Sequence, residues 1–458
     1  MNTIVAIAGL GVLCLIAEIF NLRKIIIPVT IIGLLAALGL CVADYSLSTS
    51  YFNNMVVLDK YGMAFTGLFI LLTIFLVALS PDFHKSHKPK ISDFVAIKLF
   101  LLTGAAAMVT FGNLAMFFLG IEILSIALYV LAASEPKNIK SNEAGMKYFL
   151  MGAFASGIIL FGIALVYGAT GSFDTAEIYN IVRAESQKEW FFIGIVMLTI
   201  GFLFKIAAVP FHFWAPDVYE GSPALTTATM STLAKVVAIA SFFKLMKALN
   251  YEVPGTYMTI ISIVIVLSMT VGNLLALKQS NVKRMLAFSG ISHAGFMLMV
   301  FYNPAATSGT LLYYAAAYAL AGIAAFAVIL YAISGKPNED IYQFNGLGKT
   351  NPLMAAVLTC ALLSMGGIPI FSGFFAKFFL FGDTLRTGHV TIVIIAVINS
   401  IISIGYYFKL ILAMYTKDAI EQEEKSKVPF MYGAVAVIAI LINIGMGLYP
   451  DAVMNLIR

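Results

Sequence analysis

A few ionisable residues lie inside long apolar stretches of this chain. Glu122, Lys205, Lys235 and Lys377 each lie deep in such a stretch, and His293 lies in the middle of another. A charge in a bilayer is costly unless water or a counter-charge accompanies it, so buried ionisable residues usually mark a path for ions or protons. A carboxylate with several lysines can exchange protons, because the charge on each group depends on its neighbours. These residue types therefore indicate a proton path rather than a pocket for a polar solute.

Two of these residues are expected to form a pair. Glu122 and Lys205 are each central in their own stretch. Unit charges 4 Å apart attract by about 4 kcal/mol at an effective dielectric constant of about 20. His293 lies one turn from Ser289, and a proton relay and a packed, hydrogen-bonded imidazole explain it equally well. Four further lysines lie near the ends of apolar stretches and are expected to reach water: Lys98, Lys244, Lys247 and Lys409.

The elements that position these residues must be membrane helices. Of the 458 residues, 61% are hydrophobic and only 11% are charged, and the mean hydropathy is +0.95. A soluble fold cannot hide so much apolar surface. The apolar runs are continuous, which excludes the alternating strands of an outer-membrane barrel. The basic residues form no stripe, so the net charge of +5 does not indicate nucleic-acid binding. The composition predicts an all-α polytopic membrane protein.

Apolar runs between charged or Pro/Gly-rich breaks predict about fourteen transmembrane helices. Loops after odd-numbered spans carry fifteen Lys and Arg residues, against five in the other loops and termini. By the positive-inside rule both termini should therefore lie outside the cytoplasm. The expected spans are near residues 3–20, 25–43, 60–79, 92–111, 113–132, 144–168, 190–214, 223–247, 256–277, 283–302, 308–333, 352–382, 389–415 and 429–449.

Two of the expected spans contain a proline near their middle and a lysine within eight residues of it. Pro210 follows Lys205 in the seventh span, and Pro369 precedes Lys377 in the twelfth. A proline inside a helix removes a hydrogen-bond donor, so both helices should kink or break. Interrupted helices at matching positions are typical of transporters built from inverted repeats. We therefore expect a three-helix segment over 1–91, five-helix repeats over 92–250 and 251–416, and a C-terminal loop and helix over 417–458.

Motifs for other chemistry are missing from the sequence. The three cysteines, Cys14, Cys41 and Cys360, are far apart and give no CxxC spacing for zinc or an iron–sulfur cluster. No HExxH, GxSxG or complete P-loop motif occurs, and no dinucleotide-binding fingerprint follows a strand. We therefore expect this chain to bind neither a metal ion nor NADH itself.

The segments around the buried charges resemble a known family. The segment KIAAVPFHFWAPDVYEGSP, at residues 205–223, resembles the seventh-helix signature of the subunit N family of bacterial proton-translocating NADH:quinone oxidoreductase, respiratory complex I. The resemblance is weaker to the antiporter-like subunits M and L and to multisubunit Na⁺/H⁺ antiporters. It covers essentially the whole chain. Three other segments match the family: residues 117–130, 278–293 and 366–377.

The resemblance implies a division of labour among subunits. Glu122 and Lys205 would be the charged pair, Lys235 and His293 the central relay, and Lys377 the lysine toward the exit side. This chain would translocate protons in the bacterial inner membrane beside other antiporter-like and small membrane subunits and lipid. NADH, FMN, Fe–S clusters and quinone would be bound by partner subunits. One departure is that Ile370 and Phe371 follow Pro369, where the family usually has a second proline or a smaller residue.

Two other functions are compatible with a polytopic chain of this kind. One is a cation/H⁺ antiporter, alone or in a multisubunit assembly, and the other is a passive membrane scaffold for an oxidoreductase. The scaffold does not explain three lysines deep in apolar spans. The subunits that co-purify with the chain would separate the antiporter from the oxidoreductase subunit.

Overall fold

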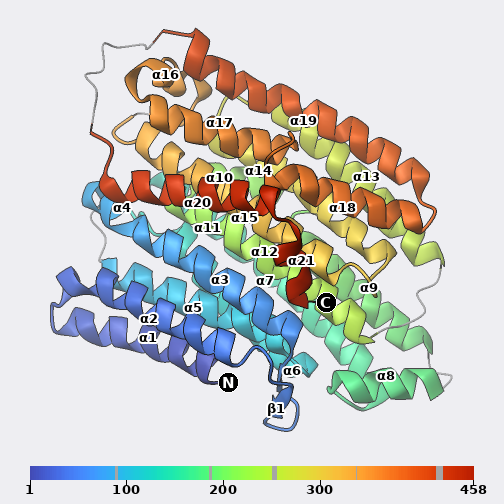
Figure 1. Cartoon of the computed structure of the whole chain (residues 1–458). Coiled ribbons are helices and arrows are strands. Elements are labelled where there is room, and N and C mark those ends of the chain that lie inside the picture. Colours follow the sequence, from blue (N-terminus) through green and yellow to red (C-terminus); the bar gives the residue numbers. More distant parts are fainter. Residues whose placement is uncertain (88–90, 185–187, 250–254, 337, 419–426, 458) are drawn as a thin grey trace.

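Long apolar helices, many of them lying side by side, make up this chain in the computed structural model (Figure 1). The structure describes residues 1–87, 91–184, 188–249, 255–336, 338–418 and 427–457. Eleven of the described helices are long and apolar enough to cross a membrane. The predicted all-helical membrane fold is confirmed, whereas the count of fourteen spans remains a prediction. Of the other three expected spans, those near 190–214 and 352–382 coincide with interrupted helices, and the span near 223–247 contains a π-helical segment.

The N-terminal segment consists of three long helices, a short one and a small hairpin. Asp59 caps the third helix by accepting a hydrogen bond from the Gly62 backbone N–H at 2.7 Å. The two strands pair antiparallel, with Ser50 opposite Val57. The elements are α1 (Asn2–Ile19), α2 (Arg23–Ala43), β1 (Thr49–Tyr51), β2 (Val56–Leu58), α3 (Lys60–Ala78) and α4 (Ser80–His87).

The middle of the chain contains the first interrupted helix. Gly171 ends the long α7 with φ +69°, a left-handed conformation that glycine adopts without strain. The elements are α5 (Ile91–Thr110), α6 (Leu114–Ala132), α7 (Ile139–Thr170), α8 (Thr175–Ala184), α9 (Lys188–Lys205), α10 (Trp214–Gly221), α11 (Ala224–Thr229), a π-helical segment (Met230–Ala234) and α12 (Lys235–Leu249). The π-helical segment was not expected from the sequence.

The rest of the chain contains the second interrupted helix. Its long elements are α13 (Gly255–Leu277), α14 (Val282–Leu298), α15 (Ser308–Ala332), α17 (Pro352–Gly366), α18 (Ser372–Arg386), α19 (Val390–Thr416) and α20 (Phe430–Leu448). The short ones are α16 (Leu347–Thr350), α21 (Asp451–Met454) and 3₁₀ turns at Met299–Tyr302, Ile341–Phe344 and Asn455–Ile457. The predicted boundary between residues 250 and 251 lies outside the described residues.

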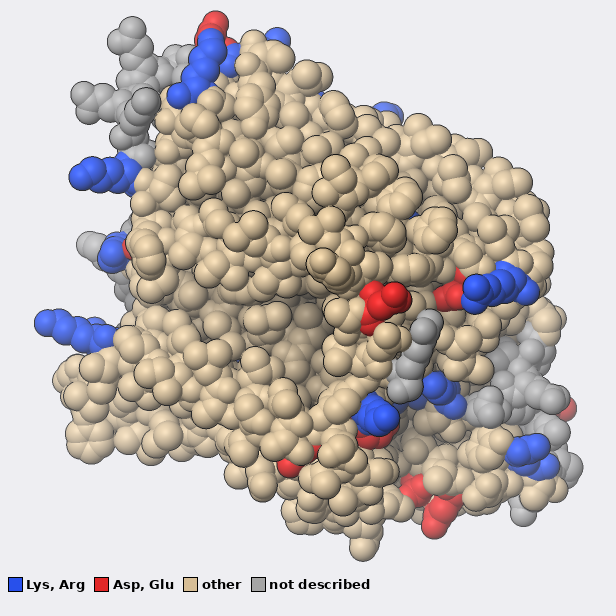
Figure 2. All heavy atoms as spheres, viewed as in Figure 1, with Lys and Arg blue, Asp and Glu red and all other residues tan. Residues whose placement is uncertain are grey.

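The burial of the helices divides the bundle into a core and a lipid-facing layer. Helices α14 and α15 are almost completely buried, whereas α1, α2 and α19 expose most of their apolar side chains. Phe154 on α7 and Ile401 on α19 are examples of large exposed apolar residues. On the face drawn in Figure 2, charged side chains lie along opposite edges and leave a broad uncharged band between them. Together with the exposed apolar side chains, such a band is typical of a surface that contacts membrane or protein partners.

One pattern of hydrogen bonds occurs twice in the chain. Asn113 caps α6 and forms an isolated bridge with Asp174, and Asn281 caps α14 and forms the same bridge with Asp340. In each case the first helical residue donates its N–H to the residue before the aspartate, Leu114 to Phe173 and Val282 to Glu339. Helix α5 packs against α6, and α13 packs against α14. These matching contacts align residues 113 and 174 with residues 281 and 340.

One lysine expected to reach water is buried, and a second is partly covered. Lys98 is only 3% exposed, and its Nζ donates to the Ser80 Oγ at 2.8 Å. The Lys244 Nζ donates to the Val109 carbonyl at 2.7 Å and pairs with Asp59 at 3.0 Å. The expectation was wrong for Lys98, because neighbouring helices cover it and Ser80 supplies a polar partner. Lys244 pairs with the partly exposed Asp59, so its contact with water stays a prediction. Such cover cannot be read from one helix alone.

Candidate functional site

The first interrupted helix ends at a lysine. Helix α9 stops at Lys205, and helical structure resumes only at Trp214, which confirms the predicted break beside Pro210. The side chains of other elements satisfy backbone groups that the break frees. The Val209 N–H donates to the Ser268 Oγ at 2.9 Å, and the Trp214 Nε1 donates to the Phe204 carbonyl at 3.0 Å. These two side-chain hydrogen bonds stabilise the broken backbone, and Lys205 lies where the break begins.

Lys205 is held by two serines rather than by a carboxylate. Its Nζ donates to the Ser125 Oγ on α6 at 2.7 Å and to the Ser156 Oγ on α7 at 3.3 Å. It also lies 6.0 Å from the centre of the Tyr129 ring. Hydroxyl oxygens that accept from the ammonium group can also donate a hydrogen bond, so they can form part of a chain of exchangeable protons.

Glu122 does not make the direct ion pair with Lys205 that the sequence predicted. Among the described residues, no ion pair joins the two side chains, and the Lys205 Nζ donates to hydroxyl groups instead. Glu122 lies one turn before Ser125 on α6, and its Oε1 is buried with no described hydrogen-bond partner. Ser125 and Ser156 accept the hydrogen bonds of the Lys205 ammonium group in place of a direct contact with Glu122. The electrostatic pairing of Glu122 with Lys205 stays a prediction.

Lys235 lies where the π-helical segment gives way to α12. Its side chain is 3% exposed, and its Nζ has no hydrogen-bond partner among the described residues. Gly290 on α14 leaves room for the ammonium group, since a Cβ at that position would lie 2.7 Å from the Lys235 Nζ and 3.2 Å from the Tyr318 Oη. A cation in this place requires water or a movable partner.

His293 lies in a cluster of tyrosines. Its Nδ1 is 2.9 Å from the Tyr314 Oη, and its Nε2 is 3.3 Å from the Tyr407 Oη. The Tyr407 Oη is in turn 2.6 Å from the Ser289 Oγ. The sequence did not identify these tyrosines, since they lie in apolar runs where an aromatic residue is usually a packing residue. The four-residue spacing of Tyr314 and Tyr318, which places both on one helix face, was the available signal.

The second interrupted helix places Lys377 beside the break. Helix α17 stops at Gly366 and α18 begins at Ser372, as the sequence predicted. The Lys377 Nζ donates to the Gly366 carbonyl at 3.0 Å and to the Ser400 Oγ at 2.8 Å. It also lies 5.0 Å from the centre of the Phe296 ring. Ile370 adopts φ +85° within the break, so the departure from the family pattern falls on an unusual backbone conformation.

A small cavity lies between His293 and Lys377. It has a volume of about 10 Å³, and Tyr314 and Tyr318 also line it. A cavity of this volume is close to the minimum that holds one water molecule. Both the His293 imidazole and the Lys377 side chain border it.

A cluster of charged residues lies at the surface beyond the first break. The Arg284 Nη1 contacts Asp217 at 2.7 Å and Glu220 at 3.0 Å, and Lys147 contacts Asp217 at 3.3 Å. Partial burial opposes ionisation of Asp217, but the hydrogen bonds and charges of Arg284 and Lys147 outweigh it and lower the pKa of this carboxyl. The cluster fixes α10 to the ends of α7 and α14.

The chemistry available to these residues is exchange of protons between nitrogen and oxygen atoms. In the part of the chain that the structure describes, no group of three or more His, Cys, Asp or Glu side chains could hold a metal ion. Lys205, Lys235, His293 and Lys377 all lie within helices of the bundle, and hydroxyl groups contact three of the four.

Comparison with known proteins identifies the family of this chain. Residues 112–403 match the model of the NADH:quinone oxidoreductase/Mrp antiporter transmembrane family. NADH-quinone oxidoreductase subunit N of Flavobacterium johnsoniae is 64% identical over all of both chains, and that of Flavobacterium psychrophilum is 60% identical, again over all of both.

The chain belongs to the NADH-quinone oxidoreductase subunit N family.

Solved structures share the fold of this family. A chain of respiratory complex I from Thermus thermophilus is 29% identical, with a TM-score of 0.85 over 99% of this chain and 98% of the other. A chain of the Mrp complex from a Dietzia species is 21% identical with a TM-score of 0.86, over 99% of this chain and 94% of that one, and shares the fold. The predicted family is thus confirmed over the full length of the chain.

Proposed function

We propose that this chain is a proton-translocating membrane subunit of an NADH:quinone oxidoreductase. The observation that carries the proposal is the series of buried ionisable groups along the bundle, Lys205, Lys235, His293 and Lys377, with serine and tyrosine hydroxyls in contact with three of them. Isolated cations are too costly in a membrane interior to serve packing alone. The alternating lysines and hydroxyls supply groups that can bind and release protons in turn.

Glu122 would control the first step of this path. It lies one turn before Ser125, which accepts a hydrogen bond from Lys205, and no ion pair among the described residues holds the two charges together. A carboxylate near a lysine favours the charged lysine, and neutralisation of the carboxylate favours release of the lysine proton. A change at Glu122 could thereby send a proton from Lys205 toward Lys235.

The chain would be organised as two inverted repeats, over 92–250 and 251–416, between the terminal segments 1–91 and 417–458. The twice-occurring Asn–Asp bridge and the two interrupted helices support this division. Five helices in each repeat would reverse the orientation of the second one. The protein would lie in a bacterial inner membrane with both termini on the periplasmic side, as the distribution of Lys and Arg indicates.

Redox chemistry would belong to partner subunits. NADH, FMN, Fe–S clusters and quinone would be bound there, and quinone reduction would drive the protonation changes in this chain. Other antiporter-like and small membrane subunits would contact its lipid-facing helices. The chain itself would form part of the enzyme as a translocase without a redox centre.

A cation/H⁺ antiporter is the second candidate, favoured by the fold shared with the Mrp chain. Purification through a tag on this chain from native membranes, followed by mass spectrometry, separates the two functions. Co-purified NADH- and Fe–S-binding subunits, with NADH-driven proton uptake in reconstituted vesicles, are expected. A chain that purifies only with antiporter subunits, and exchanges cations for protons without NADH, would support the second candidate instead.

A further inference from the structure

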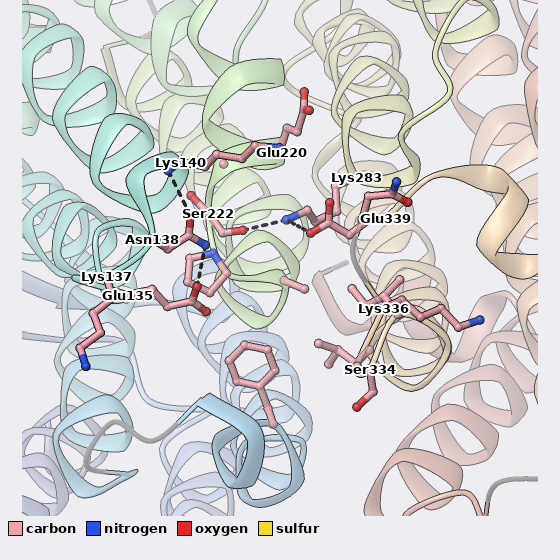
Figure 3. Close-up of a pocket in the computed structure, with 18 of the residues that line it drawn as sticks. Glu135, Lys137, Asn138, Lys140, Glu220, Ser222, Lys283, Ser334, Lys336 and Glu339 are labelled. Atoms are coloured by element: carbon pink, nitrogen blue, oxygen red, sulfur yellow. Dashed lines mark hydrogen bonds and ion pairs between the residues drawn. The ribbon is translucent and has the colours of Figure 1, made fainter.

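A large cavity lies between the two proposed repeats, at the ends of their helices. Its volume is about 820 Å³, and it is lined by the loop before α7, the start of α11, the start of α14 and the loop after α15 (Figure 3). Lys137, Lys140 and Lys336 are among its lining residues. It therefore opens on the side with the basic loops, which the distribution of Lys and Arg assigns to the cytoplasm.

One lysine links the walls of this cavity. The Lys283 Nζ pairs with the Glu339 Oε1 at 2.8 Å and donates to the Ser222 carbonyl at 2.9 Å (Figure 3). Ser222 belongs to the first proposed repeat, and Glu339 belongs to the second. The Lys283 side chain is 3% exposed, whereas that of Glu339 is 26% exposed. The carboxylate therefore borders the cavity on one side and a buried ammonium group on the other.

The inner wall offers a further polar group. The Ser222 Oγ is buried, lines the cavity and has no hydrogen-bond partner among the described residues. Helix α11 begins two residues later and continues through the π-helical segment to Lys235. At 1.5 Å per residue, this stretch is about 17 Å long. The cavity wall is thus connected along one helix to the lysine in the interior.

The equivalent place in the first repeat has no such pair. The shared hydrogen-bond pattern aligns Leu114 with Val282 and Phe173 with Glu339, so Ala115 corresponds to Lys283. An alanine and a phenylalanine therefore stand where the second repeat has an ion pair. The fold does not need charges at this position, and their presence only beside the large cavity points to a role in function.

We propose that Glu339 takes up protons from water in this cavity and that Lys283 positions its carboxylate. Protonation of Glu339 makes it neutral and weakens its attraction for Lys283, and release of the proton toward the interior restores the ion pair. This inference rests on the proposed proton translocation and identifies a residue at its uptake side.

The test compares Glu339→Gln, Glu339→Asp and Lys349→Met in the complete complex. Glutamine can still accept hydrogen bonds from Lys283 and Asn281, so a purely structural Glu339 predicts native pumping in Glu339→Gln. We expect at least about a tenfold loss of NADH-driven proton uptake per assembled complex in vesicles. Glu339→Asp should recover much of the rate and shift its pH profile. Lys349→Met breaks an exposed pair with Asp418 outside the cavity and should pump normally.

A second measurement does not depend on assembly of these variants. Ser334, an exposed residue of the cavity wall, is changed to Cys, and a bulky thiol reagent is added to the assembled complex. Labelling should slow pumping, whereas labelled Lys349→Cys and reagent-treated native complex should not change. Native pumping after labelling, or in Glu339→Gln, would overturn the inference. If Lys377→Met pumps normally in the same assay, the proposed function fails instead.

Discussion

The Lys377 ammonium group donates a hydrogen bond to the Gly366 carbonyl, 3.0 Å away, at the point where α17 ends. In a continuous helix this carbonyl would be taken by a backbone N–H four residues later. Gly367, at φ +85°, turns the chain away and leaves the oxygen for the lysine. The broken helix therefore creates a site for a cation, and the cation satisfies the carbonyl that the break frees.

Replacing Lys377 with Met should abolish most proton pumping. The substitution removes the protonatable group beside His293, and we expect at least about a tenfold fall in NADH-driven pumping per assembled complex. Lys247→Met is the matched control, because Lys247 is exposed and, among the described residues, donates to the Ser308 Oγ at 3.0 Å. Equal pumping by the two variants, at equal amounts of complex on a native gel, would contradict the assignment of Lys377.

Replacing Glu122 with Gln should reduce pumping while the complex still assembles. Since Glu122 makes no ion pair with Lys205, the variant leaves no broken salt bridge behind, and Lys205 keeps its hydrogen bonds to Ser125 and Ser156. Loss of the negative charge should nevertheless leave Lys205 neutral for more of the time. Pumping and quinone reduction are measured together in vesicles. An assembled variant with native pumping would exclude a role for this charge.

Replacing Tyr407 with Phe should weaken the path at His293. The hydroxyl group joins the His293 Nε2 to the Ser289 Oγ, and its loss removes both contacts without changing the ring. A hydrogen bond of this kind contributes about 1 kcal/mol, or roughly fivefold in rate. Tyr415→Phe, on the exposed end of the same helix, serves as the control. If Tyr407→Phe and Tyr415→Phe pump equally, the hydroxyl at Tyr407 takes no part in the path.

The stability of the chain should fall in acid partly through Asp217. The pKa of Asp217 in the folded protein lies below the ordinary value of 3.8. The contribution of this carboxylate to the free energy of unfolding is therefore complete above pH 3.8 and is lost as the pH falls through the folded pKa. Asp217→Asn should lower the thermal unfolding midpoint at neutral pH and flatten its decline below about pH 4. Asp418→Asn, at a site 89% exposed, is the control and should show little change. Parallel pH curves for native and Asp217→Asn protein would contradict this role.

Much of the architecture follows from the sequence alone. Runs of about 20 apolar residues form membrane helices, because a bilayer offers no hydrogen-bond partner for free backbone N–H and C=O groups. Pro210 and Pro369 each remove a backbone donor inside such a run, so the positions of both breaks follow from the order of the residues. The cost of a buried charge likewise singles out Lys205, Lys235 and Lys377 from composition and position.

Only the tertiary structure decided what each buried group contacts. Glu122 and Lys205 were matched by charge, yet Ser125 and Ser156 hold the lysine, because hydrogen-bond partners come from whichever helix face lies opposite. The Tyr407 hydroxyl contacts His293 although 114 residues separate them in the sequence. Lys98 on α5 is buried and donates to Ser80 at the start of α4. Helix formation depends on neighbours along the chain, whereas the partners of a side chain depend on how helices pack.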